Sequence, residues 1–422
     1  MHPPLRYVFA LRILVNLPTN AKERGIRMED KALIRISTCL VATLFLITAI
    51  STPARAESLE TSAVSAILMD PASGVVLAEK NPHERREPAS ITKIMTMLLV
   101  LEAVEEGRLS LDEEIVVSEN AHRQVDTDGS VVFLEMGEKR TVEELLIGIA
   151  VGSGNDACVA LAEHIAGSED QFVKLMNERA QELGMKNTNI VNPHGMPDPD
   201  HYTTAYDIAL MCAEAVKFPQ LLEYTSIYEY KYRDDPPLIL WNTNKLLAWY
   251  EDVVDGLKTG WTQKAGYCLA ATGEREGFRL ISVVLGCPVP RSHFQEAIKF
   301  LNYGFARYTS LPVADKKEPK TSLTVLRGTK QNIALLCDRR LAVSVPKGEE
   351  STVSWELELY SDYVTAPITK GTKLGKIIVK KNNQQLVTAG LVAAEDVGRL
   401  SFGGLFGRVI TSWLEGGTKS AY

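Results

Sequence analysis

Hydrophobic and polar positions predict an ordered series of elements in the first part of the chain. Two apolar runs, residues 62–70 and 74–80, flank a short turn and predict a β-hairpin. In residues 84–107, apolar side chains recur at helical spacing around most of the helix circumference. This pattern predicts a central, buried helix with Ser90 at or near its N-terminus.

The same spacing predicts five more helices, with two adjacent strands ahead of the last one. The helices cover residues 141–152, 155–167, 168–184, 203–216 and 292–308. The strands cover residues 257–276 and 278–288. Strands at both ends of this region with helices between them predict an α+β domain over residues 57–308, in which helices cover one sheet.

The pattern changes in the last third of the chain. Residues 309–322 are polar and contain two prolines, which is typical of a linker. Alternating apolar positions then predict strands over residues 341–346, 353–360 and 374–393. An Asn-Asn pair at 382–383 makes a plausible hairpin turn in the last of these. Together these features predict a small β-rich domain over residues 323–396.

Residues 397–422 carry one continuous apolar face at helical spacing. Its members are Phe402, Leu405, Phe406, Val409, Ile410, Trp413 and Leu414. Arginines off this face and a tryptophan near the end predict a helix that lies on a membrane surface. The alternative is packing against the β domain, and three glycines weaken the segment as an isolated helix. Its position after a complete domain favours the membrane surface.

The N-terminus has the three parts of a secretory signal. Basic Lys31 and Arg35 precede an apolar run at 40–50, and small residues flank a cleavage site after Ala56. The alternative, a membrane anchor, needs about 20 apolar residues, which is longer than this run. We therefore expect residues 1–56 to be a cleaved signal region, and Met28 would start a signal of ordinary length.

Composition narrows the classes of function. The formal net charge is -7, with neither a basic surplus for nucleic acid nor an acidic block typical of disorder. Five cysteines follow residue 56, at spacings that fit neither a metal site nor a dense disulfide framework. Since the sequence also lacks a Gly-rich phosphate loop, we expect no metal and no cofactor.

Three short motifs carry the candidate chemistry. They are Ser-x-x-Lys at 90–93, Ser-x-Asn at 153–155 and Lys-Thr-Gly at 258–260. Each is weak alone, since residues 344–347 and 118–120 match the first two by chance. Their order and setting are specific, with the first opening a buried helix, the second in a turn between helices and the third on a strand. This combination is typical of penicillin-binding proteins and class A β-lactamases.

The first motif can form an activated nucleophile. Backbone N–H groups at a helix N-terminus favour an oxyanion near the Ser90 hydroxyl. Lys93 shares its helix face and can reach that hydroxyl. A lysine acts as a base only when it is neutral, and both burial and the second cation, Lys258, lower its pKa.

The other two motifs supply proton transfer and substrate contacts. Ser153 can relay a proton to the leaving amine, and Asn155 can hold a substrate amide. Gly260 leaves a flat strand edge along which an extended peptide can lie. Thr259 offers a hydroxyl and Lys258 a charge to a carboxylate. Each motif also has a purely structural interpretation. Ser90 could cap its helix, Lys93 could extend its ammonium group to solvent, and the other two motifs could be an ordinary turn and a strand end. All of these coincidences would have to occur in one chain.

Beyond the motifs, residues 58–310 resemble the serine D-Ala-D-Ala carboxypeptidases, the low-molecular-mass penicillin-binding proteins. The similar stretches include PASITKIMT, GSGNDACVALAEHIAG, FVKLMNERAQELGMKNT, a His-Gly pair and VDGLKTGWTQKAGYCLAAT. The resemblance implies a β-lactamase/transpeptidase-like sheet, with Ser90 forming the acyl-enzyme and Lys93 as its base. It also implies that Ser153 and Asn155 serve proton transfer and substrate positioning.

The resemblance extends to the substrate side of the site. It implies that Lys258, Thr259 and Gly260 line the substrate strand and that the backbone N–H groups of Ser90 and Trp261 form the oxyanion hole. Some members have a histidine where Trp261 stands, which affects fine specificity but not a backbone donor. A basic residue after the next strand often binds the terminal carboxylate, and Arg291 is the candidate, although its surroundings depart from the family pattern.

The implied reaction is removal of the terminal D-alanine from peptidoglycan stem peptides, with β-lactams as covalent inhibitors. The β domain and terminal helix resemble those that hold the family at the outer face of the cytoplasmic membrane, so we expect an extracytoplasmic enzyme. One alternative is a class A-like β-lactamase, which should carry a downstream Glu-x-x-Leu-Asn that this chain lacks. Another is a non-catalytic penicillin-sensing or wall-binding protein, which would need no working base.

Overall fold

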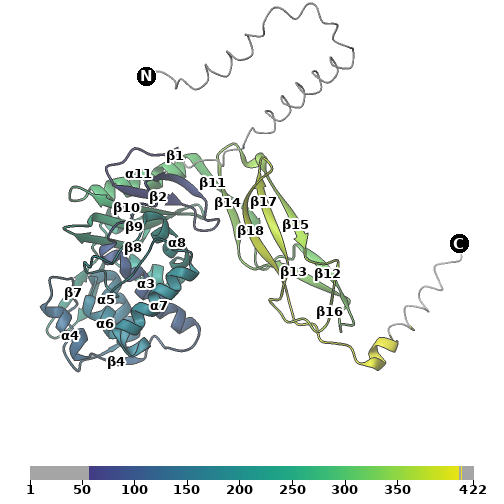
Figure 1. Ribbon diagram of the computed structural model, residues 1–422, viewed down its shortest axis with the longest axis horizontal. Coiled ribbons are helices and arrows are strands. Elements are labelled where there is room, and N and C mark those ends of the chain that lie inside the picture. Colours follow the sequence, from purple (N-terminus) through teal and green to yellow (C-terminus); the bar gives the residue numbers. More distant parts are fainter. Residues whose placement is uncertain (1–56, 408–409, 411–422) are drawn as a thin grey trace, which may run out of the picture. The chain divides into compact units, whose positions relative to one another are not determined.

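The structure, a computed structural model, describes residues 57–407 and residue 410 (Figure 1). The predicted signal region, residues 1–56, lies outside the described residues. So do Val409, Trp413 and Leu414 of the predicted terminal apolar face.

A six-stranded sheet forms the centre of the first domain, in the order β1-β3-β2-β10-β9-β8 (Figure 1). The strands are β1 (Glu57–Ser58), β2 (Ser65–Met69), β3 (Val76–Lys80), β8 (Val254–Thr262), β9 (Gly266–Arg275) and β10 (Phe278–Cys287). All neighbours pair antiparallel except β1 and β3. The predicted hairpin is β2–β3, and β8, which carries the Lys-Thr-Gly motif, is an outer strand of the sheet.

One strand prediction was wrong. Residues 257–276 form the hairpin β8–β9 rather than a single strand. The turn between them is closed by the Thr262 hydroxyl, which accepts a hydrogen bond from the Ala265 N–H at 2.9 Å, and by Gly266 at a φ of +72°. Only glycine adopts this φ readily, so the glycine marks a chain reversal that the strand pattern alone does not show.

Helices cover both faces of the sheet because alternate strand residues are apolar on each side. In β10, Ile281, Val283 and Leu285 contribute to the core beneath one group of helices. These are α3 (Lys93–Glu105), α5 (Val142–Gly152), α6 (Asn155–Ala166), α7 (Glu169–Glu182), α8 (Ala205–Ala215) and α9 (Pro219–Ser226). Leu280 and Val284 face the other core, which α11 (Ser292–Arg307) covers. The α+β architecture is thereby confirmed.

Short elements complete this domain. They are the 3₁₀ turns η1 (Ala89–Thr92) and η2 (Gln124–Asp126), helices α4 (Glu119–Arg123) and α10 (Leu246–Trp249), and two two-stranded sheets. One sheet pairs β4 (Glu114–Val116) with β5 (Lys139–Thr141), and the other pairs β6 (Glu229–Arg233) with β7 (Leu238–Trp241). Thr141 and Glu144 form a capping box at the start of α5, in which each side chain accepts a hydrogen bond from the other's backbone N–H.

The second domain is all β. It contains β11 (Tyr308–Ala314), β12 (Thr321–Leu326), β13 (Asn332–Cys337), β14 (Leu341–Pro346), η3 (Glu350–Thr352), β15 (Val353–Leu359), β16 (Tyr363–Thr365), β17 (Lys373–Lys381) and β18 (Gln384–Ala393). Six strands form a sheet in the order β15-β17-β18-β13-β12-β16, and β11 pairs with β14. The predicted hairpin turn at Asn382 and Asn383 joins β17 to β18, and both residues have positive φ.

The linker prediction differs from the structure. Residues 308–314 form β11, and only residues 315–320 remain as a connection to β12. The reason is packing, since Val313 and Ala314 are buried in a core with β14 and β17 residues. Two prolines and a run of charges concealed this short strand in the sequence.

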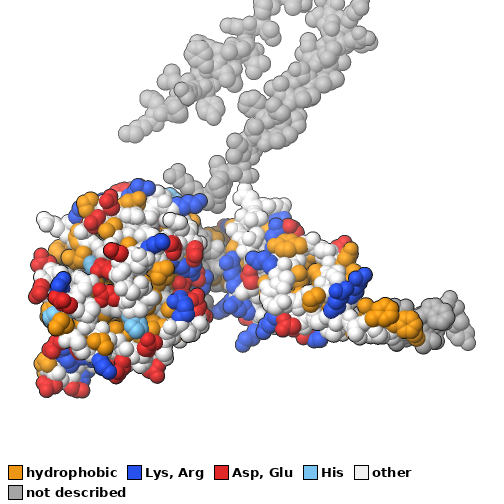
Figure 2. All heavy atoms as spheres, turned by 60° about the horizontal axis from the view of Figure 1, so that its bottom comes forward, with side chains coloured by type: hydrophobic (Ala, Val, Ile, Leu, Met, Phe, Trp, Pro, Cys, Tyr) orange, Lys and Arg blue, Asp and Glu red, His pale blue; other side chains and the backbone are white. Residues whose placement is uncertain are grey.

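Residues 402–407 at the end of the described chain are helical. Phe402 and Phe406 are 86% and 63% exposed. They do not pack against the β domain. Figure 2 shows a patch of hydrophobic side chains next to the grey atoms at one end of the molecule. None of the helices in the described residues is long and apolar enough to cross a membrane.

All five cysteines in the described residues are buried and unpaired. Burial raises the pKa of the Cys158 thiol to about 12 and that of Cys268 to about 11. Both residues therefore act as small packed side chains in the core of the first domain.

Candidate active site

The Ser-x-x-Lys motif spans the junction between η1 and α3. Ser90 lies in the 3₁₀ turn, and Lys93 is the first residue of the α-helix. The Lys93 Nζ donates to the Ser90 Oγ at 2.9 Å and to the His194 carbonyl oxygen at 2.7 Å. The Lys93 side chain is fully buried. The structure therefore brings the predicted nucleophile and base into direct contact.

Burial changes the ionisation of Lys93. Loss of solvation lowers its pKa to about 8, and the nearby Cys158 and Asp156 act in the opposite direction. At pH 7, Lys93 is therefore neutral in roughly a tenth of the molecules, a far larger fraction than for an exposed lysine. Lys93 is thus able to accept a proton.

Lys258 on β8 is the second buried lysine of the site. Its pKa is lowered to about 7, first by burial and then by the positive charge of Lys93. The two ammonium groups are close enough to repel each other, so protonation of one disfavours protonation of the other. The two lysines are thus coupled, since the charge of Lys93 contributes to the lowered pKa of Lys258.

The Ser-x-Asn motif forms the turn between α5 and α6. Ser153 ends α5 with a φ of 59°, in the left-handed region, and Asn155 begins α6. The Asn155 backbone N–H donates to the Ser130 carbonyl oxygen at 2.8 Å. Its side-chain Nδ2 is buried and has no hydrogen-bond partner in the structure. An unpartnered amide donor in this position can bind a substrate carbonyl.

The loop that precedes β5 covers Asn155. The Asp156 carboxylate accepts hydrogen bonds from the N–H groups of Val132 at 3.1 Å and Leu134 at 3.0 Å. A Cβ on Gly129 would lie 2.0 Å from the Asn155 Nδ2. The loop backbone therefore lies directly against the amide, and only glycine fits there.

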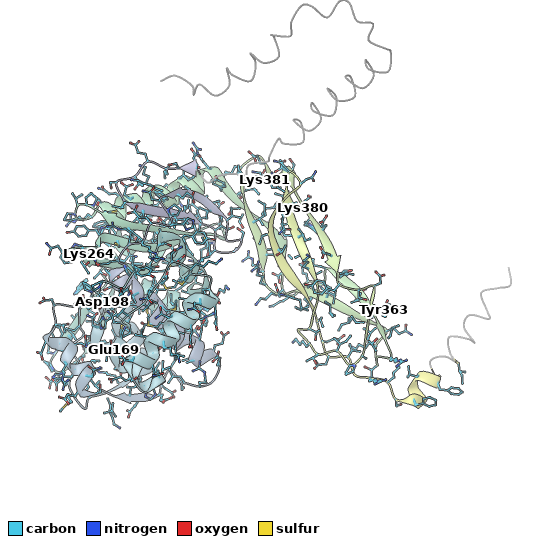
Figure 3. All side chains as sticks on the ribbon, in the orientation of Figure 1. Glu169, Asp198, Lys264, Tyr363, Lys380 and Lys381 are labelled. Atoms are coloured by element: carbon cyan, nitrogen blue, oxygen red, sulfur yellow. The ribbon has the colours of Figure 1, made fainter. Side chains whose placement is uncertain are left out.

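The substrate strand β8 packs against the turn that holds Ser90. A Cβ on Gly260 would lie 2.8 Å from the Pro88 carbonyl oxygen and 3.1 Å from the Ala89 Cβ. Lys264, in the turn after β8, forms an ion pair with Glu87, just before this turn (Figure 3). These contacts place residues 258–260 beside Ser90, the predicted nucleophile.

Residues 193–201 form another part of the site, which the three sequence motifs do not include. The His194 carbonyl oxygen accepts the hydrogen bond from Lys93 described above. The neighbouring Pro193 carbonyl oxygen accepts one from the Thr96 Oγ1 at 2.6 Å. Gly195 has a φ of +88°, and a Cβ there would lie 1.9 Å from the Ala89 carbonyl oxygen. The His-Gly pair was the available signal, because this close approach requires glycine.

Two ionisable side chains, Lys93 and Glu169, lie near the His194 ring. Burial lowers the pKa of His194 to about 3, with a further contribution from Lys93, so the ring is neutral at physiological pH. Its Nε2 is 3.7 Å from Glu169 at the start of α7, and Figure 3 shows Glu169 and Asp198 on this domain. His194 acts on Lys93 through its backbone carbonyl oxygen, which accepts the hydrogen bond from the Lys93 Nζ.

Trp261 and Arg291 differ in how closely the structure connects them to the site. Trp261 follows Gly260 on β8 with its indole 57% exposed. Arg291 precedes α11 in the left-handed conformation and is exposed. Among the described residues it forms no ion pair, and no hydrogen bond joins its side chain to the three motifs.

Comparisons with known proteins agree with this geometry. The D-alanyl-D-alanine carboxypeptidase family profile matches residues 51–289, and the profile of the penicillin-binding protein 5 C-terminal domain matches residues 308–399. D-alanyl-D-alanine carboxypeptidase DacF of Bacillus subtilis is 38% identical over 388 residues, which cover 90% of this chain and 98% of that protein.

Solved structures are similar as well. Penicillin-binding protein 5 of Haemophilus influenzae superposes with a TM-score of 0.68 at 34% identity, covering 82% of this chain and 99% of that one. Penicillin-binding protein D2 of Listeria monocytogenes in its ampicillin-bound form gives 0.52 at 32% identity, covering 58% and 99%. By sequence, by fold and by the arrangement of its buried lysines, the chain belongs to the D-alanyl-D-alanine carboxypeptidase family of serine hydrolases.

Proposed function

We propose that Ser90 is the nucleophile that removes the terminal D-alanine from peptidoglycan stem peptides, with Lys93 as its base. The single observation that carries this assignment is the 2.9 Å hydrogen bond from a fully buried Lys93 to the Ser90 hydroxyl. When Lys93 is neutral, its amine takes the hydroxyl proton as the Ser90 oxygen attacks the carbonyl carbon of the penultimate D-alanine. The product of this step is a tetrahedral oxyanion.

The oxyanion lies between two backbone donors in this mechanism. The N–H groups of Ser90 and Trp261 belong to two segments that the Gly260 contact holds together. When the intermediate collapses, the C–N bond breaks and the leaving amine takes a proton through Ser153. Free D-alanine departs and an ester remains on Ser90. Water then attacks this ester, with Lys93 accepting its proton, and the shortened peptide leaves.

The remaining residues hold the peptide. The unpartnered Asn155 Nδ2 donates to a backbone carbonyl of the substrate. The peptide lies along the open edge of β8, where Gly260 leaves space. Lys258 and Thr259 attract the terminal carboxylate, and Arg291 supplies a further positive charge at the mouth of the site. The names of the relatives, and the ampicillin complex of the Listeria protein, support this substrate and covalent trapping by β-lactams.

We also propose that the enzyme works outside the cytoplasm and is held at the membrane surface by its C-terminal segment. The exposed Phe402 and Phe406 side chains support this location, because apolar side chains of a helix that remain exposed to solvent among the described residues favour an interface. The signal pattern in residues 1–56 is consistent with export.

The assignment is tested with the purified chain from residue 57. Fluorescent penicillin should label the wild type covalently, and peptide mapping should find the label on Ser90. Ser90→Ala should abolish both labelling and D-alanine release from an N-acyl-Lys-D-Ala-D-Ala peptide. Ser361→Ala, which removes a hydroxyl from an exposed loop of the β domain, is the matched control and should retain both. Labelling on another residue would refute the role of Ser90.

A further inference from the structure

The loop between β7 and α10 is held rigidly by two buried asparagines. The Asn242 side-chain amide donates to the carbonyl oxygens of Thr225 at 3.2 Å and Ile227 at 2.9 Å. The Asn244 amide donates to the Gly256 carbonyl oxygen at 3.2 Å, near the start of β8. These bonds attach the loop to the backbone on both sides. The residue between the asparagines therefore has a fixed position.

That residue is Thr243, and it projects outward because its two neighbours are buried. Its side chain is exposed, and its Oγ1 lies 2.5 Å from the Oγ1 of Thr259 on β8. Thr259 is the middle residue of the Lys-Thr-Gly motif. A loop from a different part of the chain thus completes the hydrogen bonding of the substrate strand, and no sequence motif marks it.

The pairing of two hydroxyls restricts where each proton points. One hydroxyl donates to the other, and the second keeps its own proton for another acceptor. If Thr243 donates, the Thr259 proton is free to point into the groove. A hydroxyl that accepts one hydrogen bond also donates more strongly to the next group.

The charges nearby favour an anion as the acceptor. Lys258 is buried beside Thr259, and within the described residues it forms no ion pair and only a 3.4 Å contact to the Thr259 carbonyl oxygen. His293, which stacks on Tyr267 at 5.5 Å, adds no charge because burial lowers its pKa to about 4. A substrate carboxylate would give the Lys258 ammonium the partner that it lacks.

We propose that Thr243 is a positioning residue for the terminal carboxylate of the substrate: its hydroxyl donates to the Thr259 Oγ1 and thereby directs the Thr259 O–H to the carboxylate. This inference rests on the proposed function and adds a residue to it. Thr243 acts through Thr259 and takes no part in the attack by Ser90. Its substitution should therefore affect substrates according to whether they carry the carboxylate.

The test compares two N-acyl-D-alanyl thioesters in the purified chain from residue 57. Mercaptoacetate as the leaving group carries a carboxylate, and mercaptoethanol carries none. Thioesters are reactive enough to acylate without that contact. Thr243→Val should lower kcat/KM about tenfold or more for the mercaptoacetate ester, the size expected for a hydrogen bond to a charged group. For the mercaptoethanol ester the change should be below about twofold.

Two further variants separate positioning from a general structural role. Thr243→Ser keeps the hydroxyl and should restore most of the lost activity. In a Thr259→Val background, Thr243→Val should cost nothing further, because the group through which it acts is absent. Equal losses on both esters, full activity of Thr243→Val, or additive losses in the double variant would each overturn the inference.

The outcome can be separated from failure of the proposed function. If the wild type neither binds penicillin at Ser90 nor releases D-alanine, the enzyme assignment fails. If the wild type is active and only the Thr243 effects are missing, the assignment stands and this inference fails. Arg291→Gln, measured in parallel, shows whether the carboxylate depends on that side chain instead.

Discussion

Single side chains in this site depend on burial for their reactivity. Lys93 and Lys258 are almost completely inaccessible to solvent, and both have pKa values close to neutrality. In the proposed mechanism Lys93 must be neutral to accept the Ser90 proton, whereas Lys258 attracts an anion only while it is protonated. Because the two ammonium groups repel each other, the state with a single proton is favoured between their pKa values.

The first prediction concerns pH. The rate constant kcat/KM for D-alanine release should be bell-shaped with its maximum between about pH 7 and pH 8, since it reports ionisation of the free enzyme. On the acid side activity falls as Lys93 becomes protonated. On the alkaline side it falls as Lys258 loses its proton. Stopped assays of D-alanine release across pH 5.5 to 9.5, roughly, measure this profile.

Lys258→Arg tests whether deprotonation of Lys258 causes the loss of activity at alkaline pH. Arginine stays protonated throughout this range, so the variant should keep its activity above about pH 8 relative to its own maximum. A wild-type profile that is flat from acid to alkaline pH would contradict the roles given to both lysines.

The elements around the site contribute by close backbone contacts. The loop before β5 lies against Asn155, and β8 lies against the turn that holds Ser90. The Asp156 carboxylate fixes the loop through backbone N–H groups, so the position of Asn155 depends on the whole segment. Small changes of backbone volume should then affect catalysis without any change in the reacting groups.

Gly129→Ala tests this dependence. Its Cβ would lie 2.0 Å from the Asn155 Nδ2, so either the amide or the loop must move. We expect penicillin acylation to slow by about 10- to 100-fold, since misplaced positioning groups cost about this much. Stopped-flow or gel-based labelling measures the rate constant.

Gly398→Ala is the control for a glycine outside the site. Its added Cβ would meet only Thr329 atoms, the nearest at 3.7 Å, which is ordinary contact. Its acylation rate should equal that of the wild type. An unchanged rate in Gly129→Ala would show that Asn155 tolerates displacement and that its proposed role is wrong.

How much could be predicted from the sequence depended on whether an element was regular. The helix from Lys93, the capping box at Thr141 and the β17–β18 hairpin all have periodicity or turn residues that predict them. The segment 193–201 and the loop around Thr243 are irregular. The Lys93–His194 hydrogen bond joins residues 101 positions apart, and the Thr243–Thr259 hydrogen bond joins residues 16 positions apart. Hydrophobic periodicity carries no information about such pairings.

At the scale of the whole molecule, the proposed chemistry and the proposed membrane attachment belong to different parts of the chain. The three motifs and the His194 segment lie in the first domain, before residue 290, whereas the β domain spans residues 308–399 in the family comparison. The exposed phenylalanines follow that domain. The Leu400 N–H still donates to the Arg327 carbonyl oxygen at 2.8 Å, so the β domain includes Leu400.

A truncation after Leu400 tests the proposed anchor. The chain 57–422 should sediment with vesicles of phosphatidylglycerol and phosphatidylethanolamine, and the chain 57–400 should remain in the supernatant because the apolar face is missing. D-alanine release from a soluble peptide should agree within about twofold, since no site residue is removed.

The full-length double variant Phe402→Asp and Phe406→Asp is the matched control. It keeps the length of the segment but places charges on its apolar face, so it should behave like the truncated chain. Sedimentation of the truncated chain at the wild-type level would place the membrane contact elsewhere.

The burial of every thiol in the described residues has a practical consequence if the protein is exported as proposed. None of the five cysteines is paired, and the high pKa values leave almost no thiolate for oxidants to attack. Residues 57–407 then need no disulfide to reach this fold. Material made in a reducing cytosol should have the same covalent structure as material secreted into an oxidising space.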